Sequence, residues 1–226
     1  MTGPLHLIHV DEHIVVANKP SGLLVHRGWD NDDDVAMFRV RDALGRHVYP
    51  VHRLDRATSG VLVFALTEDV QVTLNRAFEA GEVKKRYLAL VRGAPREEGT
   101  IDSPVPKKEG GERVPALTRY ERLAQSSIDR CALVEARPAT GRLHQIRRHM
   151  KHIDHPLIGD VNYGSGALNR HYRATYGLHR LGLHALSVTL AHPHSGESVR
   201  FVAPITDDLL GPLRALGLAD AALERS

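Results

Sequence analysis

A nine-residue polar segment, HRLDRATSG at residues 52–60, carries the densest set of reactive side chains before an apolar run. Its carboxylate, Asp55, lies between Arg53 and Arg56. A neighbouring guanidinium favours the ionised form of a carboxyl group, so Asp55 is expected to stay charged and available. A charged carboxylate on a loop suits a nucleophile or a general base. A structural ion pair in a turn fits the same residues, so both interpretations stay open.

The basic residues gather in two segments. Residues 84–96 contain five Lys and Arg and no acid, and residues 142–152 contain four Lys and Arg, three His and no acid. Acidic residues gather at 30–34 instead. Bases spaced along a groove hold phosphate backbones, but solvated faces of ordinary elements give the same pattern. The charge pattern therefore allows nucleic-acid binding without requiring it.

The composition is that of a globular protein. Of 226 residues, 42% are hydrophobic, which is enough for a core, and we expect a single domain over residues 1–226. The sequence has no apolar run of membrane-spanning length and no signal-peptide pattern, so we expect a cytoplasmic protein. Cys131 is the only cysteine, which excludes an intrachain disulfide framework and a Cys-rich zinc module.

Hydrophobic periodicity and turn residues predict an α+β fold with a largely antiparallel, mixed sheet flanked by helices. Helices are expected at 35–44 before Gly45, from the cap Thr67 to Gly81, at about 140–153 with Thr140 as cap, and from about 207 onward. Strands are expected at 5–10, 14–18, 48–51, 61–66, 86–92, 118–123, 131–136, 183–190 and 198–202. Residues 94–115 are the loosest stretch, and we expect a hairpin there.

Four blocks of the sequence resemble the RluA-type pseudouridine synthases. Residues 52–60 read His-Arg-Leu-Asp-x-x-Thr-Ser-Gly, which is similar to the family signature. The other blocks are Asn-Lys-Pro-Ser-Gly at 18–22, a Lys-x-Tyr strand at 85–93, and Gly-Arg-x-His-Gln-Ile-Arg within 140–149. Shorter matches lie at 156–160, 183–185 and 201–204. The resemblance implies the pseudouridine synthase catalytic fold, with a central RNA-binding cleft.

The resemblance also implies a reaction and its residues. A uridine within RNA is isomerised without cofactor or metal: the N1–C1′ bond breaks and a C5–C1′ bond forms. Asp55 is implied to be the essential carboxylate, through attack on C1′, attack on C6 or a glycal route. Tyr87 is implied to stack on the flipped uracil, and Arg147, or alternatively Arg142, to pair with Asp55. The residues expected to contact RNA are Arg53, which would also fill the space left by the flipped base, Arg56, Lys85, Arg142, His144 and Arg148.

The RNA substrate is predicted from weaker signals. The catalytic pattern begins by residue 5, so we expect no N-terminal S4 domain of the kind that several relatives carry. His26-Arg27-x-Trp29 and the segment 177–185 are similar to members that modify uridine 65 of tRNA. We therefore expect tRNA as partner, with ribosomal RNA or dual specificity as the alternative, and no membrane or obligate protein partner.

Two other classes of protein compete with this interpretation. The spacings His149-x-x-His152 and His152-x-x-His155 fit a metal hydrolase, but His-Glu-x-x-His is missing from the sequence. A non-catalytic RNA-binding module is the second, and the presence of Asp55, Tyr87 and Arg147 argues against it.

Overall fold

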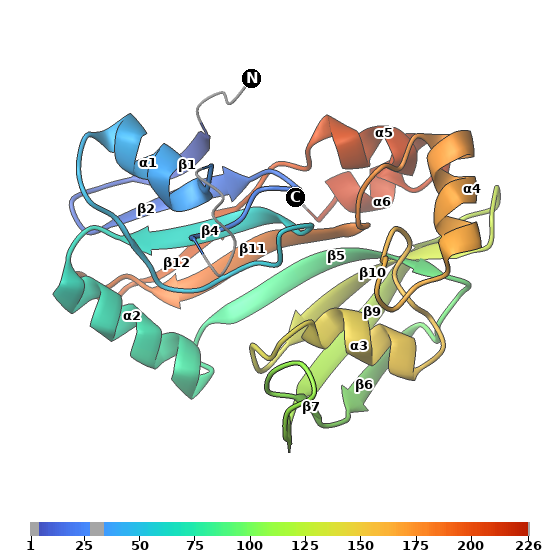
Figure 1. Ribbon diagram of the computed structural model, residues 1–226, viewed down its shortest axis with the longest axis horizontal. Coiled ribbons are helices and arrows are strands. Elements are labelled where there is room, and N and C mark those ends of the chain that lie inside the picture. Colours follow the sequence, from blue (N-terminus) through green and yellow to red (C-terminus); the bar gives the residue numbers. More distant parts are fainter. Residues whose placement is uncertain (1–4, 28–33, 226) are drawn as a thin grey trace. The chain divides into compact units, whose positions relative to one another are not determined.

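The computed structural model describes residues 5–27 and 34–225, and the expected acidic run 30–33 and Trp29 lie outside these ranges. The chain divides into two compact units. Unit 1 is Met1–Lys84 with Ala185–Pro204, and unit 2 is Lys85–His184 with Ile205–Ser226. Both combine antiparallel strands with helices, which confirms the α+β class (Figure 1). No helix of the described part is long and apolar enough to cross a membrane.

Unit 1 contains strands that the sequence predicted, and most of their pairings are antiparallel. Neighbouring strands follow the order β1-β2-β4-β11, β12 pairs with β11, and β3 pairs with β4. Their bounds are β1 His6–Val10, β2 Ile14–Lys19, β3 Tyr49–Pro50, β4 Ser59–Ala65, β11 Leu183–Ala191 and β12 Ser198–Val202. The continuous apolar run of β4 is explained by its burial on both faces, because all seven of its residues are buried.

Two helices accompany these strands, α1 (Ala36–Leu44) and α2 (Glu68–Ala80) (Figure 1). The α2 boundaries follow from local chemistry. Thr67 accepts a hydrogen bond from the backbone N–H of Val70, and Gly81 ends the helix in the left-handed conformation. Leu74 of α2 packs in one apolar cluster with Val61 and Val63, so α2 covers the face of β4 that these valines share.

Unit 2 has its own four-stranded antiparallel arrangement, in the order β5-β10-β9-β6, and a separate pair β7-β8. The strand bounds are β5 Lys84–Arg92, β6 Glu98–Asp102, β7 Val105–Pro106, β8 Arg113–Val114, β9 Leu117–Gln125 and β10 Cys131–Pro138. The expected hairpin within 94–115 is therefore present as β7-β8. The helices are α3 Gln145–His152, α4 Gly166–Tyr176, α5 Asp207–Ala215 and α6 Ala219–Leu223. Helix α3 contacts β9 and β10.

The predicted helix at 140–153 was wrong at its start, because α3 begins at Gln145. His144 adopts the left-handed conformation (φ 52°), which interrupts a right-handed helix. The Gln145 side chain instead holds the loop before the helix: its Oε1 accepts hydrogen bonds from the Thr140 hydroxyl (2.6 Å) and the Arg142 backbone N–H (3.0 Å). Arg142 consequently lies on a loop and not on the same helix as Arg147.

Two further differences concern helices. Helix α4 was not predicted, although Ser165 caps it and Gly177 ends it in the left-handed conformation. The C-terminal helix expected from 207 is two helices, because the chain leaves the helical path after Ala215 and resumes it at Ala219.

Gly60 fixes how closely two strands of unit 1 approach. Its φ is +116°, and a Cβ added there would lie 2.1 Å from the backbone oxygen of Ala185. We expect Gly60→Ala to lower the melting temperature strongly, since a backbone atom has to move. Gly196→Ala is the matched control: its φ is +72° but its Cβ would meet nothing within 4 Å. The control should cost about 1–3 kcal/mol for the left-handed backbone alone. Equal losses in the two variants, measured by thermal unfolding, would contradict the steric argument.

Candidate active site

The loop that carries Asp55 is anchored where it begins. His52 Nε2 accepts a hydrogen bond from the backbone N–H of Val63 (3.0 Å), and its ring stacks on Phe78 with centroids 4.7 Å apart. The loop then turns at Asp55, whose carbonyl accepts a hydrogen bond from the Thr58 N–H (3.0 Å). These contacts fix the backbone on both sides of the half-buried Asp55.

A buried lysine fixes the same loop from the other side. Lys19, at the end of β2, is 0% exposed. Its ammonium group donates hydrogen bonds to the carbonyl oxygens of Pro20 (2.9 Å), Leu23 (2.6 Å) and Arg56 (3.1 Å). A buried charge needs such partners, and here they come from the Asp55 loop and from the turn after β2. Lys19 therefore ties the two segments together.

Further hydrogen bonds complete this junction. Gly22 N–H donates to the Arg56 carbonyl (2.8 Å), and Arg56 Nε donates to the Gly22 carbonyl (2.9 Å). The Ser21 hydroxyl donates to the Ala57 carbonyl (2.8 Å). The blocks 18–22 and 52–60, which are distant in the sequence, thus form one structural element of unit 1. Arg53 and Arg56 are both exposed at the surface of the loop. Arg56 donates the hydrogen bond to Gly22 in addition to its expected contact with RNA.

Strand β5 of unit 2 carries Lys85 and Tyr87 on one face, because side chains two apart point the same way. Tyr87 is half-buried and lies opposite Ala136 of β10. Lys85 Nζ donates to the Thr140 carbonyl (3.2 Å). Burial, and then the nearby charge of Arg142, lower the pKa of Lys85. Arg86 points the other way, into an ion pair with the fully buried Glu135.

Arg147 of α3 is held by a buried carboxylate. Its Nε and Nη2 donate to the two oxygens of Asp160, at 2.7 and 2.8 Å. Arg147 is 6% exposed and Asp160 1% exposed. Burial acts to raise the pKa of Asp160, but the hydrogen bonds and charge of Arg147 hold it below its usual range. Asp160 Oδ1 also accepts from the backbone N–H groups of Asn162 (2.9 Å) and Tyr163 (3.1 Å).

Sequence reasoning assigned no role to Asp160 or Tyr163, yet both surround Arg147. The Arg147 guanidinium lies 5.1 Å from the centroid of the Tyr163 ring. The Tyr163 hydroxyl is 3.0 Å from Nδ1 of His144. Asp160 belongs to the block 156–160 that resembles the family, but the sequence of this block does not show that Asp160 pairs with Arg147.

The remaining expected RNA contacts lie around the start of α3. Arg142 is exposed, and Arg148 Nη2 donates to Glu109 of the β7-β8 hairpin (2.9 Å). The hairpin is thereby joined to α3. These contacts place Arg142, His144, Arg147 and Arg148 in one neighbourhood of unit 2.

One of the histidines considered for a metal, His149, is engaged in other contacts. His149 is buried: its Nδ1 contacts the Thr118 hydroxyl (2.8 Å) and its Nε2 the Ser103 carbonyl (2.9 Å). Burial lowers the pKa of His149. Within residues 5–27 and 34–225, no three His, Cys, Asp or Glu side chains are grouped so as to hold a metal ion.

Comparison with known proteins gives a consistent result. The family described as RNA pseudouridylate synthase matches residues 13–152. The chain is 42% identical to tRNA pseudouridine synthase C of Yersinia pestis, over 98% of this chain and 95% of that protein. It is 36% identical to tRNA pseudouridine synthase C of Vibrio cholerae, over 97% of this chain and 98% of that protein. The solved structure of Human RNA Pseudouridylate Synthase Domain Containing 4 has a TM-score of 0.76 and 28% identity, with coverage of 94% of this chain and 93% of that chain.

The Lys19 junction gives a stability prediction. Lys19→Met keeps the length of the side chain and removes the ammonium group, so three carbonyls lose a donor, of which that of Arg56 keeps the Gly22 N–H. We expect a loss of about 1–3 kcal/mol per unsatisfied group at most, together with reduced turnover. Lys84→Met, at an exposed position of β5, is the control and should unfold like the wild type. A Lys19→Met protein as stable and active as Lys84→Met would show that the junction holds without the ammonium.

The Arg147–Asp160 pair gives a pH prediction. Asp160→Asn keeps the shape but removes the buried carboxylate charge that faces the Arg147 guanidinium, and breaking a buried ion pair in this way costs about 3–5 kcal/mol at pH 7. Because the pKa of Asp160 is lowered in the folded protein, its contribution is complete above the usual value of 3.8 and is lost as pH falls through the folded value. Urea unfolding between pH 7 and pH 3 should show the gap between wild type and variant closing at the acidic end. The exposed Asp69→Asn should follow the wild type throughout, and a pH-independent gap for Asp160→Asn would contradict the assignment.

Proposed function

This chain belongs to the RNA pseudouridylate synthase family and is a pseudouridine synthase, an isomerase, and we propose that its substrate is tRNA, with uridine 65 as the target. The observation that carries the proposal is the similarity to proteins named tRNA pseudouridine synthase C, which extends over almost the whole chain. A tRNA substrate is encountered in the cytoplasm, and we propose that the enzyme works there.

The reaction moves a base without adding or removing atoms. The N1–C1′ bond breaks, the uracil turns, C5 bonds to C1′, and the proton on C5 leaves while N1 gains one. The isomerisation is redox-neutral, so the proposal includes no cofactor and no metal.

In this proposal Asp55 is the essential carboxylate. Attack on C1′, attack on C6 and assistance to a glycal route all require an ionised carboxylate at a fixed position. The support from this chain is the rigid loop: the His52 anchor, the turn at Thr58 and the Lys19 junction all restrict the backbone on which Asp55 lies. A positioned carboxylate avoids the cost of ordering the group during the reaction.

Tyr87 and Arg147 are proposed to serve the same reaction. Stacking of the Tyr87 ring on the extruded uracil contributes about 1–3 kcal/mol, which offsets much of the few kcal/mol needed to flip a base out of a folded RNA. The Arg147 guanidinium is proposed to hold the Asp55 carboxylate in its charged form, and Arg142 is the alternative for this role. Asp160 supports the choice of Arg147, because it fixes one edge of that guanidinium in place.

RNA contacts are proposed for the exposed and half-buried basic side chains of the expected RNA-binding residues. Arg53 on the Asp55 loop is proposed to occupy the space that the flipped uridine leaves. Arg56, Lys85, Arg142, His144 and Arg148 are proposed to contact the RNA near the target. Their number suits a phosphate backbone, which is held by charge and not read by sequence.

The function is tested with unmodified tRNA transcripts that carry tritium at uridine C5, in the presence of EDTA. Wild type should release tritium, and Asp55→Asn should reduce release by several orders of magnitude while still binding the RNA, since the substitution removes a charge with little change in shape. Asp69→Asn, an exposed carboxylate in the same unit, should react like the wild type.

The modified position is then mapped by carbodiimide treatment and primer extension. One stop at uridine 65 is the expected result. Release from ribosomal RNA but not from tRNA would keep the chemistry and overturn the substrate, and normal release by Asp55→Asn would overturn the role of Asp55.

A further inference from the structure

Unit 2 carries a basic surface that has no role in the proposed function. It consists of four exposed arginines, Arg92, Arg130, Arg170 and Arg173, which we call the α4 basic surface. Arg92 ends β5, five residues beyond Tyr87. At about 3.3 Å per residue of strand, this places the surface about 17 Å from Tyr87 along β5.

Helix α4 supplies two of the arginines. Arg170 and Arg173 are three residues apart, so they lie on the same side of the helix. The opposite side is used for packing, since Tyr172 is fully buried. No Asp or Glu occurs between residues 161 and 180, so α4 and the segments on either side of it carry only positive and neutral side chains.

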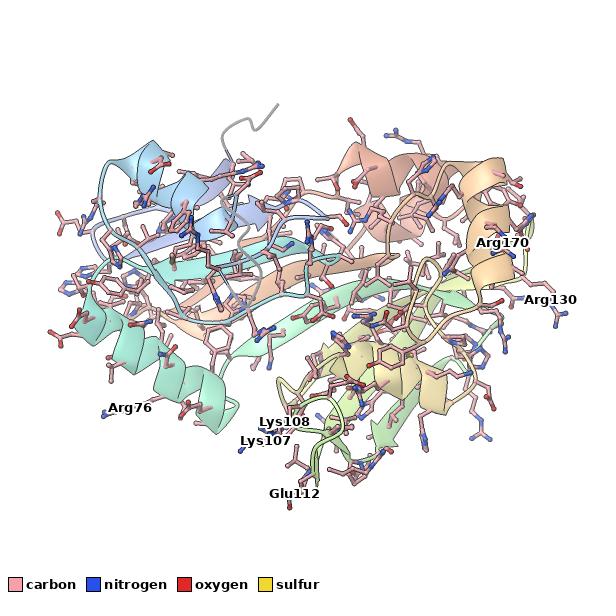
Figure 2. All side chains as sticks on the ribbon, viewed as in Figure 1. Arg76, Lys107, Lys108, Glu112, Arg130 and Arg170 are labelled. Atoms are coloured by element: carbon pink, nitrogen blue, oxygen red, sulfur yellow. The ribbon has the colours of Figure 1, made fainter. Side chains whose placement is uncertain are left out.

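Hydrogen bonds join the three segments that form the surface. Asp129, in the turn between β9 and β10, accepts from His171 (2.7 Å) and Tyr176 (3.0 Å) of α4. The carbonyl of Arg130 in the same turn accepts from Gly93 N–H after β5 (2.7 Å). Arg130 and Arg170 consequently project from the same side of unit 2, as Figure 2 shows.

The acids of this region do not cancel its charge. Burial acts to raise the pKa of Asp129, but its hydrogen bonds, including the two from α4, lower that pKa overall. Asp154 is exposed, and its carbonyl accepts from Arg92 Nη2 (3.2 Å). The segments that form the surface thus carry four exposed arginines and two aspartates, which leaves them a net positive charge at neutral pH.

The surface is also connected rigidly to the Arg147 neighbourhood. Asn169 of α4 donates through Nδ2 to the Asp160 carbonyl (2.9 Å) and accepts through Oδ1 from Gly159 N–H (2.9 Å). Asp160 is the residue that holds Arg147. A ligand bound along α4 would accordingly have a fixed position relative to Arg147.

We propose that the α4 basic surface binds the phosphate backbone of the substrate RNA at a site remote from the target uridine. This proposal rests on the proposed function and deepens it. Guanidinium groups bind phosphate through paired N–H donors, and they hold the backbone without reading its sequence. The surface would thus recognise the extended shape of the RNA beyond the segment that contains the target.

The test compares full-length tRNA with a short hairpin that carries the target uridine, using Arg170→Ala/Arg173→Ala. Alanine favours helix, so α4 should remain folded, which thermal unfolding checks. We expect a several-fold rise in KM and Kd for tRNA and unchanged kcat at saturating tRNA. The slope of log K against log salt should fall by about 0.9 for each duplex phosphate that the variant no longer neutralises. Binding of the hairpin should not change.

Arg76→Ala/Arg200→Ala is the matched control, since it removes two exposed arginines from unit 1. If the control weakens tRNA binding equally, the effect follows from net charge alone and the proposal is overturned. Unchanged tRNA binding by Arg170→Ala/Arg173→Ala would also overturn it, as would an equal reduction for the short hairpin. A failure of the proposed function is seen separately, as absence of tritium release from tRNA by the wild type.

Discussion

The Lys19 ammonium group is the contact on which the candidate catalytic loop depends. A charge removed from water is costly unless its hydrogen bonds are replaced, and three backbone carbonyls replace them here. One of these carbonyls belongs to Arg56, the residue next to Asp55. The hydrogen bond from Lys19 therefore also restricts the position of the Asp55 backbone. The turn at 20–23 is restricted by the same bonds.

Unit 2 also contains a buried cation, and its charge is balanced in a different way. The buried Arg147 is matched by a carboxylate, Asp160, which also accepts two backbone N–H groups. Removing one member of such a pair is far more costly than replacing both by apolar side chains of similar volume, so the pair fixes the guanidinium and the turn 160–163 together. In unit 1 a cation orders the loop of a carboxylate, and in unit 2 a carboxylate orders a cation.

The parts of the fold that sequence predicted are those governed by local rules. The run 61–66 is a buried strand because its residues are apolar throughout, and α2 begins and ends where Thr67 and Gly81 place its caps. The start of α3 could not be predicted in this way: His144 adopts the left-handed conformation, and the side chain of Gln145, which holds the preceding loop, also bonds to Leu117 and Thr118 of another strand. For the candidate site, the resemblance led to the proposal of Asp55, Tyr87 and Arg147, and their roles stay predictions. The contact between Arg147 and Asp160 depends on tertiary structure that no spacing reveals.

The close approach of Gly60 to Ala185 has a consequence for how the chain is made. Unit 1 is discontinuous, and its apolar cluster joins Val61 and Val63 to Val188 and Phe201. During synthesis residues 1–84 leave the ribosome long before these partners exist, and contacts so distant in sequence form slowly. Completion of the framework around the Asp55 loop therefore awaits the translation of residues 185–204, after the whole of the 85–184 segment has emerged. A truncated chain that ends before β11 would carry every residue of the signature at 52–60 and lack the support that holds it.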